Sequence, residues 1–229
     1  MSNLRRWISK AAAAVAPERW KSFAELHYWK QQKQKEGHLS NDHYPYFYTK
    51  YFGLPYSFYD GKRILDIGCG PRGSLEWADT AKQRVGLDPL ADEYARLGAD
   101  AHAMEYVASG SESIPFGDGH FDVVCAFNSL DHVSDVEHSI REIKRVTAHN
   151  GLFLLMVEIN HPPTECEPHE LSPHIVDAFG PEFDCITCNV YPPEEQGLYQ
   201  TLQHRNPVPH PMEYSDQGWL TAQFRRAAR

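Results

Sequence analysis

The chain has 229 residues and a formal net charge of −9, and hydrophobic residues make up 41% of it. This length suffices for one α/β domain with a substantial core and an appendage. The acidic balance argues against a large nucleic-acid footprint, and no apolar run in the sequence reaches the length of a membrane span. The five cysteines indicate reduced thiols rather than a disulfide framework, so we expect a cytoplasmic protein.

Residues 1–60 predict a helical and aromatic N-terminal cap. A first helix is expected over 3–16, and a second runs from Pro17, which suits a first helical turn, to about residue 36. Residues 43–59 are crowded with aromatic side chains, and a helix is expected there over 44–52. These aromatic side chains either form a lid over a site or pack the cap onto the rest of the protein.

The first helix imitates a signal peptide poorly, because Lys10 interrupts a short stretch that is mostly alanine. Its arginines lie on one side, which is typical of a surface or partner helix. The alternative is peripheral contact with an anionic membrane surface through Leu4, Trp7 and Ile8.

Short apolar strands alternate with helices in the next hundred residues. The expected elements are strands over 63–67, 84–88, 101–106, 121–128 and 152–159, and helices over 73–78, 91–97 and 136–148. This alternation predicts an α/β fold, a doubly wound parallel sheet with helices on both faces.

Past residue 159 the chain becomes rich in proline and histidine. A helix over 173–179 and strands over 183–190 and 219–225 are expected there. Two insertions, 160–172 and 191–211, are placed to act as lids over a site in a domain that spans 61–229.

A glycine turn follows the first of these strands. Gly68, Gly70 and Gly73 fit the G-x-G-x-x-G dinucleotide pattern, which is a weak signal on its own. Asp66 precedes the turn at the strand end. A pyrophosphate is anionic and binds to the N–H groups at a helix N-terminus, so a carboxylate at this place would repel it. The same acid suits a cationic ligand, so the turn favours a ligand other than a dinucleotide.

Further motifs follow in order. They are Val85-Gly86-Leu87-Asp88, Ile114-Pro115-Phe116 with Phe121-Asp122-Val123-Val124, Phe127-Asn128-Ser129-Leu130-Asp131-His132-Val133, and Arg141-Glu142-Ile143-Lys144-Arg145-Val146 with Asn150-Gly151-Leu152. Together with Asp-x-Gly-x-Gly at 66–70, they resemble the class I S-adenosylmethionine-dependent methyltransferases, in particular the small-molecule "methyltransferase 11"-like family. The resemblance covers about 62–158. It implies a Rossmann-like, mostly parallel sheet with an antiparallel last strand at its edge.

The resemblance also implies S-adenosyl-L-methionine as the cofactor. It places the cofactor against Asp66, Gly68, Cys69, Gly70, Asp88, Pro89, Ser111, Glu112 and Asn128. Asp88 would hold the ribose hydroxyls, and the glycines would let the backbone approach the ligand. The family often has an aspartate where this chain has Gly110, so Ser111 or Glu112 is expected to take over the adenine contact.

The candidate catalytic residues are three histidines. His132 follows the fourth strand and is the best candidate for a general base, although it could equally cap or pack a helix. Its neighbour Asp131 does not form a ready dyad with it, because adjacent helical residues do not face each other. His161 and His169 lie in the loop after the fifth strand, and a substrate-facing loop is favoured over a metal site, so no metal is assigned.

The predicted function is methyl transfer to a small molecule by in-line displacement, with a hydroxyl of a sugar or natural-product metabolite as the leading acceptor. Two alternatives stay open, N-methylation of a small amine and a catalytically silent methyltransferase-like binding subunit. An NAD-dependent oxidoreductase fits the bare glycine pattern but not Asp66. No nucleic-acid partner is expected, and the sequence does not give the oligomeric state.

Overall fold

The computed structural model describes residues 17–195 and 197–228. The helix expected over 3–16, with its membrane alternative, lies outside the described residues. The α-helices are α2 (Pro17–Glu36), α3 (Tyr44–Tyr48), α4 (Ala91–Tyr94), α5 (Val136–Val146) and α6 (Leu198–His204). Short 3-10 helices span Lys50–Phe52, Tyr56–Tyr59, Ala95–Leu97, Ala99–Ala101, Pro173–Phe179 and Pro211–Glu213. Within the described residues, no helix is both long and apolar enough to cross a membrane.

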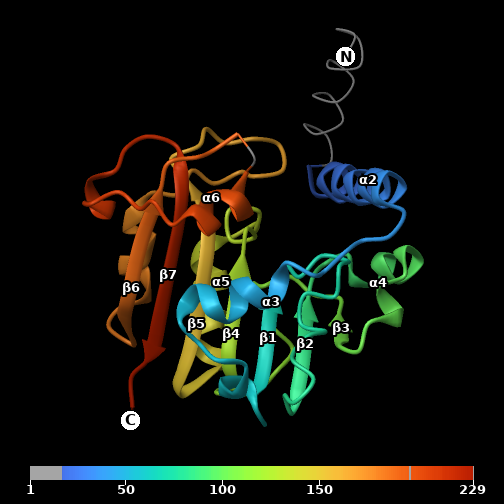
Figure 1. Ribbon diagram of the computed structural model, residues 1–229, viewed down its shortest axis with the longest axis horizontal. Coiled ribbons are helices and arrows are strands. Elements are labelled where there is room, and N and C mark those ends of the chain that lie inside the picture. Colours follow the sequence, from blue (N-terminus) through green and yellow to red (C-terminus); the bar gives the residue numbers. More distant parts are fainter. Residues whose placement is uncertain (1–16, 196, 229) are drawn as a thin grey trace, which may run out of the picture.

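Seven strands form one sheet in the order β3-β2-β1-β4-β5-β7-β6 (Figure 1). The strands are β1 (Arg63–Ile67), β2 (Gln83–Leu87), β3 (Glu105–Val107), β4 (Phe121–Phe127), β5 (Thr147–Ile159), β6 (Phe183–Tyr191) and β7 (Gly218–Arg226). Pairs among β1 to β5 are parallel, and β7 is antiparallel to both of its neighbours. The predicted α/β class, the Rossmann-like parallel sheet and the antiparallel last strand are therefore confirmed.

Alternating residues of the central strands serve two separate cores. On one face, Leu65 and Val124 join a cluster with α5 and the segment Pro173–Phe179. On the other face, Ile64 and Cys125 join a cluster with α3 and α6. Side chains of a strand point alternately to the two faces, so a sheet covered on both sides needs apolar residues at nearly every position.

The helix expected over 73–78 is wrong, because that segment forms only turns. Glycine and proline occupy the short connection 68–82, which leaves little chain for a helix. The aromatic cap covers this part of the sheet instead. The rings of Tyr48 and Tyr59 lie 5.8 and 5.0 Å from the ring of Trp77.

Other expectations differ in extent or position. The strand expected over 101–106 is wrong in its first part, because 3-10 turns after Gly98 keep residues 99–101 coiled and β3 begins only at Glu105. The helix expected over 44–52 breaks at Thr49, whose φ and ψ are −115° and −92°. The last strand does not lie at the sheet edge, because β6 pairs with its outer side. The insertion 191–211 contains α6, which the sequence analysis did not predict.

Candidate functional site

A cavity of about 540 Å³ lies at the carboxyl ends of the central parallel strands. Its lining comes from the turns after β1, β2 and β4 and from α2, and α2 lies beyond the carboxyl ends of the parallel strands (Figure 1). Ligands of open α/β sheets bind at this end of the strands, where the chain turns away to opposite faces. The expected cofactor residues that line the cavity are Gly68, Cys69, Gly70, Asp88, Pro89, Ser111, Glu112 and Asn128.

The glycine turn shapes the floor of the cavity. Gly68 has a φ of +69° and donates its N–H to the carbonyl of Leu87 at 2.7 Å. A Cβ on Gly68 would collide with Cβ of Ser129, so both the backbone conformation and the space require glycine here. A Cβ on Gly70 would lie 3.1 Å from the indole of Trp29 on α2, which places the helix directly over the turn.

Asp88 follows β2 and is buried beside the turn. Its Oδ1 accepts the N–H of Leu90 at 2.9 Å, and its Oδ2 accepts the N–H of Gly70 at 3.2 Å. Burial and the nearby Glu25 carboxylate raise the pKa of Asp88 to about 7. Each carboxylate oxygen has a further lone pair, so Asp88 can still accept hydrogen bonds from a ligand.

Asp66 lies behind the cavity wall rather than in it. It is buried, and its Oδ2 accepts hydrogen bonds from the hydroxyls of Tyr48, at 2.8 Å, and Ser74. Burial raises its pKa to about 7, while these two hydrogen bonds oppose the shift. The structure therefore ties Asp66 to the aromatic cap and the turn, and it is not among the residues that line the cavity.

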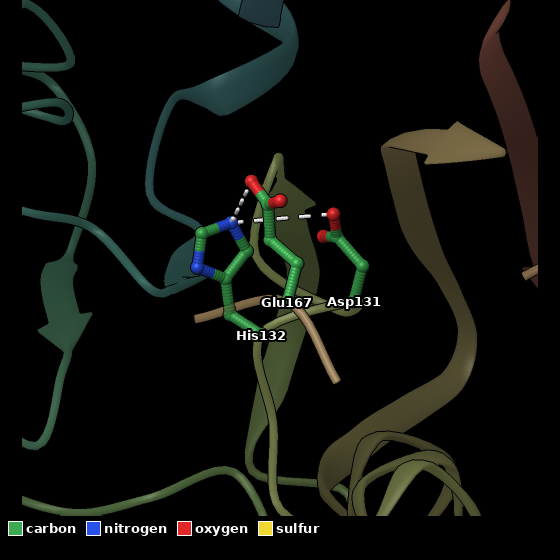
Figure 2. A group of neighbouring side chains, drawn as sticks. All are labelled: Asp131, His132 and Glu167. Atoms are coloured by element: carbon green, nitrogen blue, oxygen red, sulfur yellow. Dashed lines mark ion pairs between the residues drawn. The ribbon is translucent and has the colours of Figure 1, made fainter. Parts of the chain in front are cut away.

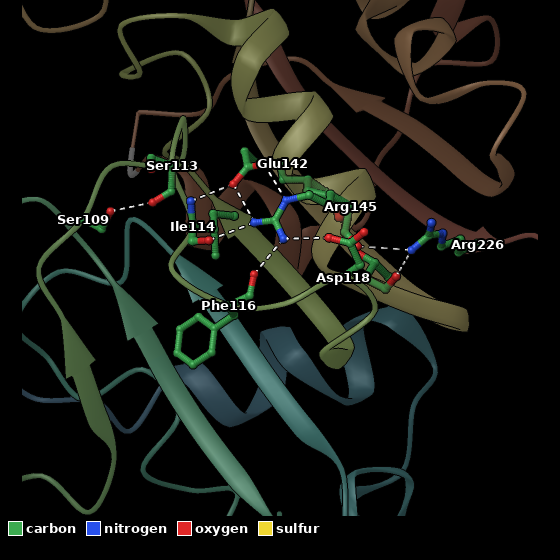
Figure 3. A network of polar contacts seen from close by, with 10 residues as sticks. Ser109, Ser113, Ile114, Phe116, Asp118, Glu142, Arg145 and Arg226 are labelled. Carbon is green, nitrogen blue, oxygen red and sulfur yellow. Dashed lines mark hydrogen bonds and ion pairs between the residues drawn. The ribbon is translucent and has the colours of Figure 1, made fainter.

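Arg145 of α5 fixes the segment 114–116, which directly follows the loop with Ser111 and Glu112 (Figure 3). The guanidinium of Arg145 donates to the carbonyls of Ile114 and Phe116 at 2.9 and 2.7 Å. It also pairs with Glu142, which accepts the N–H of Ile114 at 2.8 Å. This network anchors the loop to α5.

Glu112 occupies the space that a side chain at position 110 would fill. A Cβ on Gly110 would lie 2.6 Å from Oε2 of Glu112. Oε1 of Glu112 accepts hydrogen bonds from the N–H groups of Ser134 and Asp135 at 2.7 and 3.2 Å. Glu112 also borders the cavity. Ser111 turns its hydroxyl away to Ser139 on α5, at 2.7 Å.

The end of β4 brings charged and imidazole groups together at the cavity rim. Asn128, with φ +54°, starts the turn that places Asp131 and His132 there. Nε2 of His132 lies 4.0 Å from Oδ2 of Asp131 and 3.7 Å from Oε1 of Glu167, which comes from the loop 160–172 (Figure 2). His132 and Glu167 line the cavity, whereas Asp131 is fully buried. Burial raises the pKa of Asp131, and the facing imidazoles oppose the shift.

The structure separates the three candidate histidines. His161 is buried behind Asp131, with 3.5 Å between its Nε2 and Oδ2 of Asp131. His169 has its Nε2 2.8 Å from the carbonyl oxygen of Val133. A carbonyl oxygen only accepts, so His169 donates there and ties the loop 160–172 to the turn after β4. Of the three, His132 borders the cavity.

The aromatic cap and the insertion 191–211, which were both expected as lids, meet at the cavity. Tyr44 of α3 and Tyr199 of α6 both line it, and their rings lie 6.2 Å apart in an edge-on arrangement. Most of the other cap aromatics are core, since Phe47, Tyr48 and Tyr59 are almost fully buried. The insertion 191–211 therefore packs on the cap through α6.

Sequence reasoning did not place α2 at the site. Its residues Glu18, Lys21, Ser22, Ala24, Glu25, Tyr28 and Trp29 line the cavity. The buried Nε1 of Trp29 has no hydrogen-bond partner among the described residues. A helix that is polar on all sides often spans a solvent-filled gap between other parts of a protein. The polar pattern of 17–36 was therefore the signal in the sequence that could have placed this helix over a cavity.

The cavity is acidic. Its lining includes five carboxylates, Glu18, Glu25, Asp88, Glu112 and Glu167. Among the described residues of the lining, Lys21 is the one basic side chain apart from His132. Such a lining attracts a cationic ligand and opposes an anionic one.

Known proteins match the part of the chain that builds this cavity. Residues 65–155 match the family model described as "Methyltransferase domain". The chain is 33% identical over 100 residues to the uncharacterized methyltransferase YcgJ of Bacillus subtilis, a match over 41% of this chain and 40% of that protein. The solved structure of YcgJ superposes with a TM-score of 0.53 over 73% of this chain and 93% of that chain, at 16% identity.

Two relatives with named reactions also match. The ubiquinone/menaquinone biosynthesis C-methyltransferase UbiE of Pseudomonas savastanoi is 32% identical over 117 residues, 44% of this chain and 43% of that protein. The chloroplastic tocopherol O-methyltransferase of Arabidopsis thaliana is 28% identical over 103 residues, 42% of this chain and 30% of that protein. The chain thus spans less than half the length of each of these curated relatives. On the family match, the segment 65–155 belongs to the class I S-adenosylmethionine-dependent methyltransferases.

Proposed function

We propose that this protein transfers the methyl group of S-adenosyl-L-methionine to a hydroxyl group of a small molecule, such as a sugar or a natural-product metabolite. One observation carries the proposal. A single cavity is bordered on one side by the glycine turn and Asp88 and on the other by His132 and Glu167. Groups suited to the cofactor and groups suited to an acceptor hydroxyl thus lie in one cavity.

The residues present fit the cofactor. Its ammonium and sulfonium groups are cationic, and the cavity lining is acidic. Asp88 has lone pairs left for the two ribose hydroxyls, and the unpartnered Nε1 of Trp29 is a donor close to the glycine turn. Glu112 takes the place of the aspartate that relatives often carry at position 110, so it is our candidate for the adenine contact.

The cofactor supplies a methyl carbon already activated by the positive sulfur. The protein's task is to align the acceptor, exclude water and remove the acceptor's proton. In the balanced step an oxygen–carbon bond forms, the carbon–sulfur bond breaks with its electron pair going to sulfur, and the hydroxyl proton leaves to a base. The neutral thioether S-adenosylhomocysteine is the second product.

His132 is the proposed base, because it borders the cavity and imidazole is the most frequent general base in enzymes. Asp131 and His161 stand behind it as positioning residues. We assign His169 the anchoring of the loop 160–172, since its Nε2 already donates to the main chain. Tyr28, Tyr44 and Tyr199 give the acceptor an aromatic wall.

The acidic lining favours an uncharged or cationic acceptor. A small amine fits this charge and stays the second candidate, although an ammonium must lose its proton before it attacks. The base at the rim favours the hydroxyl, whose high pKa makes a base necessary. A silent binding subunit would keep the residues that bind the cofactor. It would not need the cluster of Asp131, His132 and Glu167.

The test measures S-adenosylhomocysteine formation from S-adenosylmethionine with panels of hydroxyl and amine acceptors. We expect turnover with a hydroxyl acceptor. We also expect His132→Gln to lower kcat by about 100-fold or more with KM for the cofactor nearly unchanged. Turnover confined to amines would overturn the acceptor class. Cofactor binding without turnover of any acceptor would support the silent subunit instead.

A further inference from the structure

We propose that Asp131, His132 and Glu167 form a binding site for one first-row divalent transition-metal ion, such as Mn²⁺ or Zn²⁺, at the rim of the cavity. The ion's role toward an acceptor rests on the proposed function, but the site itself does not. The three residues come from the turn after β4 and from the loop 160–172, so the fold brings them together from two separate segments.

The geometry suits a shared ion better than hydrogen bonds. The three potential ligand atoms all lie within 4.8 Å of one another. Nε2 of His132 lies 3.7 Å from Glu167 and 4.0 Å from Asp131, too far for a hydrogen bond to either. Ligands that share one ion at the usual bond lengths stand roughly 3 to 4 Å apart. Figure 2 shows Nε2 of His132 facing both carboxylates.

The buried carboxylate of Asp131 has two imidazoles near it, at 3.5 and 4.0 Å, but no hydrogen bond from any described residue. The residue is fully buried, and neither of its oxygens has a hydrogen-bond partner in the part of the chain that the structure describes. The same holds for Nε2 of His132. Buried charges in proteins are normally paired, hydrogen-bonded or bound to a metal, because an unpaired one is costly. These orphaned atoms all point into one small space.

His161 strengthens the argument through its tautomer. Its Nδ1 lies 3.1 Å from the carbonyl oxygen of Pro162, which can only accept, so the ring proton sits on Nδ1. Nε2 then faces Oδ2 of Asp131 at 3.5 Å without a hydrogen bond between the two atoms. Oε2 of Glu167 accepts the hydroxyl of Thr164 at 3.1 Å, and Oε1 of Glu167 faces Nε2 of His132.

The donor set selects the class of ion. Imidazole nitrogen with two carboxylates suits Mn²⁺, Zn²⁺ and their neighbours, whereas Ca²⁺ and Mg²⁺ prefer oxygen alone. Three protein ligands leave coordination positions open, and His132 and Glu167 direct them toward the cavity. An acceptor hydroxyl that occupies such a position would lose its proton more readily, and the ion would then take the place of His132 as the agent of deprotonation.

The test uses the full chain after chelator treatment, without cofactor or acceptor. Mn²⁺ binding is followed by the electron paramagnetic resonance signal of the free ion, and Zn²⁺ binding by calorimetry. We expect one ion per chain. Glu167→Gln and His132→Gln should weaken binding by at least about tenfold, and His161→Gln by about 10- to 100-fold as a positioning residue. Glu170→Gln changes an exposed carboxylate of the same loop and should bind as the wild type does.

Glu167 is the decisive position because its side chain is 30% exposed, so Glu167→Gln should leave the fold intact. The absence of saturable binding in folded wild type would overturn the site. So would equal affinities of Glu167→Gln and Glu170→Gln. S-adenosylhomocysteine binding measured in excess chelator tests the proposed function separately, so the two can fail independently. Addition of a catechol to the Co²⁺-loaded protein should change its visible spectrum, which reports oxygen entering the coordination sphere.

Discussion

Asp66 and Asp88 are buried carboxylates on either side of the glycine turn, and both have a pKa raised to about 7 by burial. A carboxylate with a raised pKa holds its proton longer in the folded state than in the unfolded state. The free energy of unfolding therefore falls as pH rises from the unfolded value of 3.8 toward 7. The protein without its ligand therefore loses stability toward neutral pH, and of the two carboxylates Asp88 is the one that lines the cavity.

Replacing Asp66 tests this directly. Asp66→Asn keeps an oxygen for Tyr48 and Ser74 but cannot ionise. Between pH 5 and pH 8, wild type should lose roughly 2 to 3 kcal/mol more stability than this variant. Urea unfolding at the two pH values measures the difference, and the exposed Asp92→Asn is the control. An equal loss in Asp66→Asn and wild type would show that the Asp66 carboxyl is not perturbed.

Glu112 is the proposed adenine contact, and Gly110 leaves room for its side chain. Gly110 has an ordinary φ, so an alanine there adds no backbone strain. Its Cβ would push the carboxylate of Glu112 out of its place. The far end of a glutamate moves easily, so the fold should tolerate the change.

We therefore expect Gly110→Ala to weaken S-adenosylhomocysteine binding several-fold while the free energy of unfolding changes by no more than about 1 kcal/mol. Calorimetry and thermal unfolding measure the two effects. Gly117→Ala is the matched control, because its Cβ would meet nothing within 4 Å. If Gly110→Ala bound the ligand as tightly as Gly117→Ala, Glu112 would not contact the adenine.

The cavity residues that the sequence could predict differ in position from those that it could not. Gly68, Asp88 and Asn128 lie where short strands end, and local pattern alone places such positions at the cavity. Trp29 and Glu167 reach the cavity from a distant helix and loop, so only tertiary packing reveals them. The sequence shows Asp131 next to His132, but it does not show that the Asp131 side chain is fully buried.

At the scale of elements, α2 is held by several polar contacts and by Leu26 and Trp29, which pack against the small cluster of Leu90, Tyr94, Leu97 and Ala99. Glu36 pairs with Arg72 at 2.6 Å, Lys33 donates to the carbonyl of Leu97 at 2.9 Å, and Ser134 donates to Glu18 at 3.0 Å. Of its larger apolar side chains, Phe23 is 60% exposed. Polar surface contacts contribute little each, so α2 should open at low cost and give the ligand a way in.

Hydrogen exchange can test this role. In the unliganded protein, amides of α2 should exchange faster than those of β5, which lies in the middle of the sheet. S-adenosylhomocysteine should slow exchange in α2 and leave α5 nearly unchanged, since α2 lines the cavity and α5 lies beneath it. Mass spectrometry of peptides from both helices measures the effect. Ligand-independent exchange in α2 would contradict its place over the bound cofactor.

The order of strands and helices was largely predictable, and the failures have physical causes. Apolar runs such as 152–159 identify strands, because a sheet covered on both faces buries nearly every residue. The absence of a helix after β1 was not predictable, because the aromatic cap packs in its place. The helix α6 was not predictable either, because contacts with the same cap stabilise it. The rings of Phe47 and Tyr199 lie 4.7 Å apart across this contact. Such packing between distant segments overrides local propensity.

At the scale of the whole molecule, the chain carries a net charge of −9, and part of it lies in the cavity lining. Five of the carboxylates line one cavity, at the end of the sheet where the parallel strands finish. The family match over 65–155 and the acidic lining of this cavity are both consistent with a cationic cofactor. The cap and the two insertions surround the remaining space, and we propose that they select the acceptor.

The most direct measurement is calorimetric titration of the folded chain with S-adenosylhomocysteine, using wild type, Asp88→Ala and Asp92→Ala. We expect one molecule bound per chain, with affinity reduced at least about tenfold in Asp88→Ala, which loses its charge-assisted hydrogen bonds to the ribose. Asp92→Ala, an exposed acid in the next helix, should bind as the wild type does. No binding by folded wild type, or equal binding by Asp88→Ala, would contradict the cofactor site described for this cavity.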